Sequence, residues 1–144
     1  MKNLLYLFFA LLLTSFSSVE NTDISISLPL GGNAFSSKHI DGSNTITDKG
    51  IENWTDSSEY FTAYFRISKP GTFKITIEDS VEVYGKSELE FSINNESKKV
   101  KFDVSNKKVI VGTWKISNEG YVAIKIKGVS KTGKQFPSIN RLTI

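Results

Sequence analysis

The residues best suited to binding a ligand lie in a polar loop that the sequence predicts at residues 41–58. Trp54 stands there between Asn53 and the polar pair Thr55 and Asp56. A sugar has an apolar C–H face surrounded by hydroxyl groups, so an indole beside amides and carboxylates is a suitable partner for it. The alternative is that Trp54 closes one end of the domain as part of its core. Both interpretations stay open, and we predict from the first that Trp54 stacks on a ligand.

Four further side chains are predicted to complete this binding surface. Asn33 lies in a Gly-Gly-Asn turn, and Asn53 directly precedes the tryptophan. Tyr64 and Arg66 occupy the polar side of an alternating strand, where a phenol ring and a planar guanidinium can form a platform. If both faces of that strand are covered, the two side chains are instead a buried pair. We expect this binding surface to lie where the turn at residues 31–35 meets the predicted loop at residues 41–58.

Sequence signatures of catalysis and of metal binding are absent. The chain has one histidine, His39, and no cysteine, which excludes a zinc site of ordinary ligand spacing. It contains no G-x-S-x-G, P-loop or G-x-G-x-x-G motif. Two carboxylate pairs, Asp41 with Asp48 and Glu78 with Glu82, are interpreted as solvated turn residues, with calcium binding as the alternative. We predict no catalytic residue, no metal ligand and no cofactor, although calcium stays open without a clear motif.

Residues 1–17 have the pattern of a signal peptide. Lys2 precedes an apolar run at residues 4–13, which is shorter than the roughly 20 residues that span a bilayer. Ser15 and Ser17 place small residues at the positions that a cleavage site requires. We expect a secreted or periplasmic protein without stable membrane insertion after cleavage. A retained N-terminal anchor is the alternative.

The charge of the chain gives little indication of a polyanionic partner. Its formal net charge is +3, too small to indicate binding of nucleic acid or of an anionic membrane. Most of the later lysines lie on the polar side of alternating strands, as Lys99 and Lys101 do around Val100. Solvated strand faces and protected sheet edges explain this pattern, and a polyanion-binding face is the alternative. We predict no nucleic-acid partner.

Short β-strands must position these residues. Tyr60 to Ile67 alternates strictly between apolar and polar residues, and the Ser-Lys-Pro-Gly sequence at residues 68–71 predicts a type II turn into a second alternating strand that reaches Ile77. This segment is the best-specified hairpin in the sequence. Alternation also predicts strands at residues 24–30, 34–40, 81–83, 88–93, 98–104, 109–116, 121–127 and 138–144. We therefore predict an all-β fold, a β-sandwich of about eight to ten antiparallel strands formed by residues 18–144 as a single domain.

Two residues carry predictions about packing. Pro29 suits an edge strand or a strand end, because proline cannot donate a hydrogen bond to a neighbouring strand. Trp114 shares the side of its strand with Ile110 and Ile116, which predicts that it belongs to the core.

Four segments, in this order, resemble a family of secreted bacterial domains of unknown function. They are residues 30–35, 50–56, 64–66 and 120–124. In that family the domain often lies N-terminal to a larger domain in proteins of carbohydrate-active type. The resemblance implies a sugar-binding or accessory domain, and it carries no catalytic residues.

The chain is also similar to carbohydrate-binding modules with the galactose-binding-like jelly roll. This similarity lies in residues 69–73, 120–121 and 139–142. Those modules commonly hold a structural calcium between a glutamate on the first strand and a late aspartate. Here residues 24–28 contain no glutamate and the late position is Asn140, which departs from the calcium pattern. What this resemblance implies for the fold is a β-sandwich of jelly-roll type.

Together these observations predict a non-catalytic carbohydrate-binding or accessory module with a glycan as partner. The alternative, from another class, is a protein–protein interaction domain at the cell surface or in the periplasm. Such a domain would use the lysine-bearing strands or an exposed edge strand to contact its protein partner. Catalysis ranks behind both, and we expect that the chain is not an enzyme.

Overall fold

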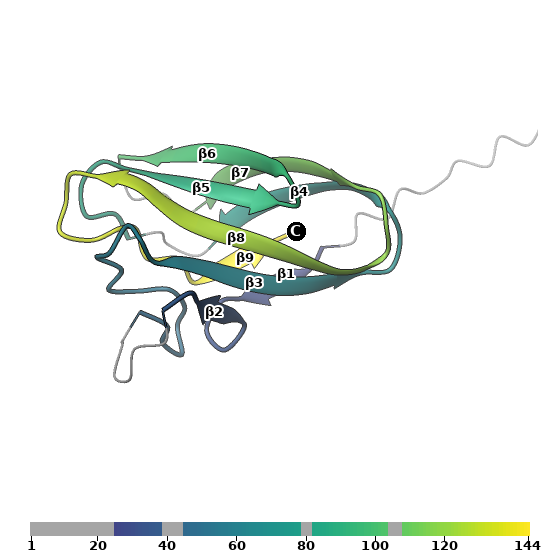
Figure 1. The fold of residues 1–144 in the computed structure, drawn as a ribbon, viewed down its shortest axis with the longest axis horizontal. Helices are drawn as coiled ribbons and strands as arrows, with labels where there is room; N and C mark the ends of the chain where they lie inside the picture. Colours follow the sequence, from purple (N-terminus) through teal and green to yellow (C-terminus); the bar gives the residue numbers. More distant parts are fainter. Residues whose placement is uncertain (1–24, 39–44, 79–81, 104–107) are drawn as a thin grey trace, which may run out of the picture.

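The structure is a computed structural model that describes residues 25–38, 45–78, 82–103 and 108–144. Over these residues the chain forms nine β-strands and no helix, in two sheets that pack face to face (Figure 1). The prediction of an all-β sandwich is confirmed. No helix in this part of the chain is long and apolar enough to cross a bilayer. The predicted signal peptide, residues 1–17, lies outside the described residues.

Every pair of neighbouring strands is antiparallel. The five-stranded sheet has the order β2-β3-β8-β5-β6, and the four-stranded sheet has the order β1-β9-β4-β7. The strands are β1 (Ser27–Pro29), β2 (Ala34–Ser36), β3 (Tyr60–Ile67), β4 (Gly71–Glu78), β5 (Ser87–Ile93), β6 (Glu96–Phe102), β7 (Lys108–Ile116), β8 (Gly120–Lys131) and β9 (Arg141–Thr143).

The predicted hairpin between β3 and β4 is wrong. β3 pairs with β8, while β4 pairs with β7 and β9 in the other sheet. Residues 68–70 therefore carry the chain from one sheet to the other, and Gly71 lacks the positive φ that the predicted type II turn requires. Both strands alternate because each turns its apolar side toward the shared core. The alternation identifies that side but not the strand with which each one pairs.

The core lies between the two sheets and contains the largest apolar side chains. The fully buried aromatic residues are Trp54, Phe61, Phe91, Phe102, Trp114 and Phe136. Burial of Trp114 confirms its predicted place in the core. Ile110 lies in the same strand, yet 60% of its side chain is exposed. A β-bulge causes the difference: Ile75 pairs with Gly112 and Thr76 with Ile110, so the extra residue between them reverses the alternation.

The terminal elements are shorter than predicted. β1 and β2 have three residues each, and so does β9, where longer strands were expected at residues 24–30, 34–40 and 138–144. Val83 is not in a strand, and Val81 lies outside the described residues. β1 is an edge strand, which confirms the interpretation of Pro29.

Candidate functional site

Trp54 is a core residue. Its side chain is 0% exposed, meets Phe61 edge-on with 5.0 Å between ring centroids, and packs against Phe136 at 4.5 Å. The indole Nε1–H donates a hydrogen bond to the carbonyl oxygen of Asp56 at 2.8 Å. An indole enclosed in this way has no free face for a ligand. The prediction that Trp54 forms an exposed stacking surface is wrong, and the packing interpretation holds.

The two segments that were expected to form the binding surface do meet. A Cβ added to Gly31 would lie 2.2 Å from the carbonyl oxygen of Asp48, so the two backbones are in direct contact. Asn33 is exposed, and its Nδ2 donates a hydrogen bond to the carbonyl oxygen of Pro29 at 2.9 Å. Asn53 is exposed and has a positive φ of 51°. Ligand binding by the two asparagines stays a prediction.

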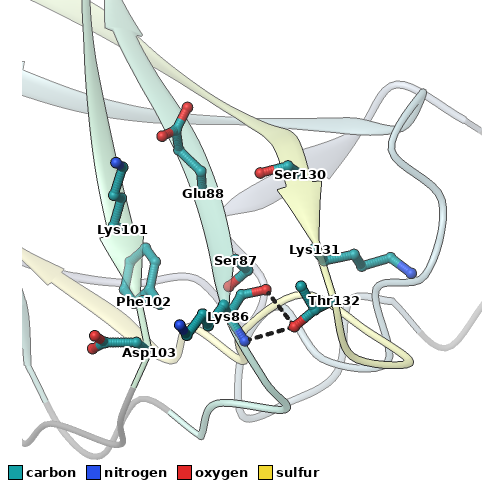
Figure 2. A pocket seen from close by; sticks show the side chains of 9 residues that line it. All are labelled: Lys86, Ser87, Glu88, Lys101, Phe102, Asp103, Ser130, Lys131 and Thr132. Carbon is teal, nitrogen blue, oxygen red and sulfur yellow. Dashed lines mark hydrogen bonds between the residues drawn. The ribbon is translucent and has the colours of Figure 1, made fainter.

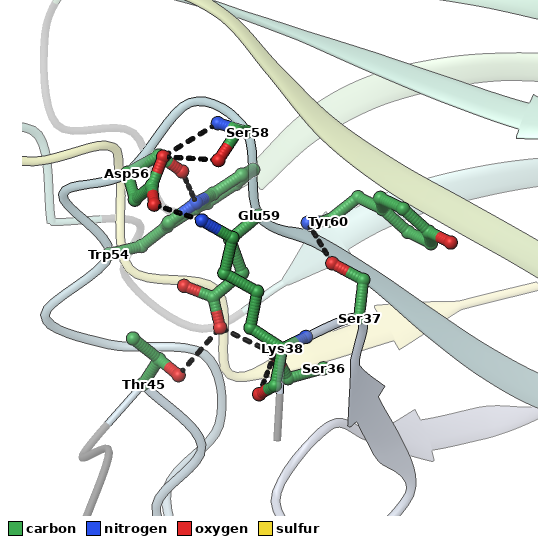
Figure 3. A network of polar contacts seen from close by, with 9 residues as sticks. All are labelled: Ser36, Ser37, Lys38, Thr45, Trp54, Asp56, Ser58, Glu59 and Tyr60. Atoms are coloured by element: carbon green, nitrogen blue, oxygen red, sulfur yellow. Dashed lines mark hydrogen bonds and ion pairs between the residues drawn. The ribbon is translucent and has the colours of Figure 1, made fainter. Parts of the chain in front are cut away.

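The buried carboxylate of Glu59 connects the loop to β2 and to the start of β3 through hydrogen bonds, as Figure 3 shows. Glu59 is 5% exposed, and its Oε1 accepts hydrogen bonds from the Ser36 hydroxyl at 2.5 Å and the Thr45 hydroxyl at 3.0 Å. These contacts tie a residue of β2 and a residue of the loop to the start of β3. Because these hydroxyls already donate to Glu59, the arrangement suits a structural role.

A second part of this network lies at the surface (Figure 3). The Lys38 ammonium contacts the Asp56 carboxylate at 2.5 Å, and Asp56 also accepts hydrogen bonds from the backbone N–H and the hydroxyl of Ser58. The hydrogen bond from Lys38, together with those from Ser58, holds the pKa of Asp56 below its usual range. Polar contacts therefore hold residues 45–58 in place, and this segment keeps Trp54 in the core instead of exposing it to a ligand.

The exposed aromatic side chains lie instead on the outer face of the five-stranded sheet. Tyr121 is 80% exposed, Phe35 61% and Tyr64 49%. They come from β8, β2 and β3, which are neighbouring strands (Figure 1). The rings of Phe35 and Tyr64 meet edge-on with 5.9 Å between centroids. We call these three residues the aromatic patch.

The pairing of the strands fixes what surrounds the aromatic patch. Tyr64 lies opposite Ala123, and Arg66 lies opposite Tyr121. Tyr64 and Arg66 are both exposed, so the alternative that they form a buried pair is wrong. The structure brings these two predicted residues together on one face, whereas Trp54 lies in the core.

Sequence reasoning missed Phe35 and Tyr121 as possible ligand-binding residues. Tyr121 occupies the polar side of the alternating strand in which Val122 is buried, and this was the available signal. Phe35 follows a Gly-Gly-Asn turn in a strand of three residues, too short to show a period. A further aromatic residue of the same face, Tyr60, is partly covered, because the Lys125 ammonium lies 4.1 Å from its ring centroid.

A cavity of about 400 Å³ lies where β5 begins and β6 and β8 end (Figure 2). Its charged lining mixes signs: Lys86, Lys101 and Lys131 with Glu88 and Asp103. The Lys131 ammonium donates to the carbonyl oxygen of Lys134 at 3.0 Å, and the Thr132 hydroxyl exchanges hydrogen bonds with the backbone of Lys86. The one aromatic residue of the lining, Phe102, is buried. This cavity offers no exposed ring on which a sugar would stack.

No group of three or more histidine, cysteine, aspartate or glutamate residues that could hold a metal ion occurs in the described part of the chain. Asp41 of the first predicted carboxylate pair lies outside that part. Glu78 of the second pair accepts hydrogen bonds from Lys108 at 2.6 Å and from Thr143 at 3.0 Å, which lower the pKa of Glu78. The expectation of no cofactor stays a prediction.

The fold and the site define a β-sandwich domain that presents exposed aromatic residues on one sheet. The chain belongs to the family described as a domain of unknown function, DUF5077, which matches residues 28–144. This membership confirms the resemblance to a domain family of unknown function. Export and a position ahead of a larger domain stay predictions. A search of curated proteins finds no matching sequence.

Three solved structures share the fold over 83% of this chain. The GH26-CBM35 β-(1,4)-mannanase of Podospora anserina is 16% identical, with a TM-score of 0.59. The CBM35 of Abf62 from Cellvibrio japonicus is 12% identical, with a TM-score of 0.58. The isomalto-dextranase of Arthrobacter globiformis T6, complexed with panose, is 12% identical, with a TM-score of 0.54.

The match covers very different shares of those proteins. It spans 27% of the mannanase and 23% of the isomalto-dextranase, but 91% of the Cellvibrio module. At identities this low, the similarity shows the fold alone. That fold is the jelly-roll β-sandwich, as predicted.

Proposed function

We propose that this chain is a carbohydrate-binding module and that it binds glycan through the aromatic patch. The observation that carries the proposal is the exposure of Phe35, Tyr64 and Tyr121 side by side on three hydrogen-bonded strands. Contiguous exposed apolar side chains mark interaction sites, since leaving them in water has a free-energy cost. Strands hold their side chains more rigidly than loops do, so little ordering is needed on binding.

The surroundings of the aromatic patch suit a ligand that is apolar on one face and polar around its rim. Arg66 lies opposite Tyr121 on the same face, and its guanidinium offers several N–H donors to hydroxyl or ring oxygens. Thr62, opposite Phe35, adds a hydroxyl group. Sugars combine a C–H face with a rim of hydroxyl groups, which matches rings flanked by such donors.

The structural comparisons support the same class of ligand. Two of the three similar structures carry CBM35, a carbohydrate-binding module, in their names. We further propose that the module is non-catalytic, because the aromatic patch and Arg66 supply no pair of groups for acid–base chemistry. The apolar run at residues 4–13 supports export, which would place the glycan outside the cytoplasm.

A screen of purified residues 18–144 against soluble polysaccharides by affinity electrophoresis tests the proposal. We expect retardation by at least one polysaccharide, and we expect Tyr121→Ala to reduce it. Ile110→Ala is the matched control, because Ile110 is also highly exposed but belongs to the other sheet. The proposal fails if no polysaccharide retards the protein, or if Ile110→Ala has the same effect as Tyr121→Ala.

A protein-binding domain is the second candidate function. Tyrosine and arginine dominate the binding energy of many protein interfaces, and Tyr64, Tyr121 and Arg66 lie together here. A competition experiment between polysaccharide and a captured protein distinguishes the two functions. An extracellular protein captured through the aromatic patch, with no displacement by any polysaccharide of the screen, would favour the second candidate.

A further inference from the structure

We propose that the aromatic patch binds an internal stretch of an extended polysaccharide chain, which crosses β2, β3 and β8 diagonally. This inference rests on the proposed carbohydrate binding and adds the form of the ligand. The ligand is a polymer segment, as opposed to a monosaccharide, a chain end or a crystalline surface.

The strand register places the backbone positions of the three aromatic residues on one straight line across the sheet. Phe35 lies opposite Thr62, two residues before Tyr64 in β3, and Tyr121 lies opposite Arg66, two residues after Tyr64. Each step along the line therefore moves one strand across and two residues along the sheet. With strands about 4.8 Å apart and a rise of about 3.4 Å per residue, the line from Phe35 to Tyr121 is about 17 Å long. That is longer than a single sugar ring.

All three aromatic residues along this line are exposed to solvent. Phe35 lies in the edge strand β2, and Tyr121 is the second residue of β8 with 80% of its side chain exposed. Recognition of a chain end or a single sugar calls for a concave site that encloses most of the ligand. The cavity at residues 86–88, 101–103 and 130–132 lies farther along β8, beyond Lys127, and is not part of this line. An open row of rings suits a chain that continues past both ends.

The tilt between the rings disfavours a flat surface as ligand. The planes of Phe35 and Tyr64 stand at 67° to each other. A planar crystalline face cannot stack on both rings at once, whereas a single chain can present successive sugar rings at different angles. The tilt therefore favours a dissolved or swollen chain.

The two sides of the row differ in a way that suits a polar chain. Arg66 borders it on one side, between Tyr64 and Tyr121. Thr62 and Ala123 border it on the other side, and Ala123 leaves room beside the rings. Lys125 lies opposite Thr62, farther from the row, and its ammonium lies over the Tyr60 ring, 4.1 Å from the ring centroid. Hydroxyl groups on both edges of a chain would thus find donors while its C–H faces meet the rings.

The test is calorimetry with an oligosaccharide series derived from a polysaccharide that the screen identifies, from the monosaccharide to the hexasaccharide. We expect affinity to rise at least tenfold along the series and then to reach a plateau. Phe35→Ala and Tyr121→Ala each remove one end of the row, so each should weaken the long oligosaccharides by about tenfold and the shortest ones much less. Ile110→Ala should leave the whole series unchanged.

The inference and the proposed function fail in different ways. A monosaccharide that binds as tightly as the hexasaccharide overturns the chain-binding inference but leaves carbohydrate binding intact. The inference also fails if binding requires a free chain end, or if the microcrystalline polysaccharide competes better than its dissolved chain. If no polysaccharide binds in the screen, the proposed function fails and the inference fails with it.

Discussion

The ring of Phe35 meets the ring of Tyr64 edge-on, with 5.9 Å between the ring centroids. This contact joins the edge strand β2 to β3 on the outer face of the five-stranded sheet. Edge-to-face contacts are favourable because the positive edge of one ring meets the negative face of the other. Each ring therefore restricts the orientation that the other presents to a ligand.

The contribution of Phe35 to glycan binding should depend on Tyr64. We expect Phe35→Ala and Tyr64→Ala each to weaken binding by about tenfold, the scale of one lost aromatic contact. The double variant should lose less than the sum, by about 0.5–1 kcal/mol, because each single variant already frees the remaining ring. Calorimetry with a long oligosaccharide gives the affinities of the wild type, the two single variants and the double variant. Strictly additive losses would show that the two rings bind independently.

Trp54→Ala should destabilise the fold. The substitution removes a fully buried indole, its two ring contacts and a hydrogen bond, so we expect a loss of about 3–5 kcal/mol. Urea unfolding followed by circular dichroism gives the free energy of unfolding. Tyr121→Ala is the control and should change it by less than about 0.5 kcal/mol, because Tyr121 is exposed. A stable Trp54→Ala variant with weakened glycan binding would restore the stacking role of Trp54.

The sequence predicted the faces of strands better than their partners. Alternation is a local property, so it correctly placed Trp114 on the core side of its strand and Tyr64 and Arg66 on the opposite side of theirs, which the structure shows to be exposed. The choice between a hairpin and a connection that crosses to the other sheet depends on contacts with strands distant in sequence. Pro70 and Gly71 favour a turn in either case, and the pairing of β3 with β8 had no local signal.

Two residues show where a periodic pattern stops being informative. Trp54 lies in a loop, where no period distinguishes an inward from an outward side chain, and its polar neighbours suggested exposure. Its burial follows from contacts with Phe61, in the strand that follows the loop, and with Phe136, which comes from a distant part of the chain. Ile110 lies in a strand with a clear period, but the β-bulge that reverses the period arises from pairing with β4. Both errors come from long-range packing that overrides local pattern.

Glu78 should contribute to stability in a pH-dependent way. Its hydrogen bonds with Lys108 and Thr143 lower the pKa of Glu78 from its ordinary value of 4.5. The folded state therefore favours the ionised carboxylate, so this contribution is complete above about pH 4.5 and is lost as the pH falls through the lowered value. We expect Glu78→Gln to lower the midpoint of thermal unfolding at neutral pH, with a difference from wild type that shrinks in acid. Added salt should also reduce that difference.

The control for Glu78 is another glutamate in a different setting. Glu119→Gln changes an exposed residue next to Gly120 at the start of β8. It should shift the midpoint of unfolding little at any pH between neutral and about pH 3. If the Glu78→Gln difference persists unchanged in acid, the hydrogen bonds with Lys108 and Thr143 do not favour the ionised form.

The contact between the turn at Gly31 and the loop at Asp48 should tolerate no side chain. A Cβ on Gly31 would lie 2.2 Å from the carbonyl oxygen of Asp48, a backbone atom that cannot move aside without shifting the loop. We expect Gly31→Ala to lower the free energy of unfolding by about 1–3 kcal/mol, as overpacking does elsewhere. Gly71→Ala is the matched control, because an added Cβ there meets only the Phe73 ring, at an ordinary contact distance of 3.5 Å.

Gly31→Ala also tests whether glycan binds at the loop or at the aromatic patch. Hydrogen exchange should show faster exchange of the Glu52 amide in Gly31→Ala, because its hydrogen bond to the Thr45 carbonyl lies within the displaced loop. Phe35, Tyr64 and Tyr121 lie on β2, β3 and β8, and the pairing of these three strands holds them in place, so glycan affinity should change less than twofold. A large loss of glycan affinity in Gly31→Ala, with unchanged affinity in Tyr121→Ala, would move the binding surface from the aromatic patch to the junction of turn and loop. That junction is where Asn33 and Asn53 were predicted to act.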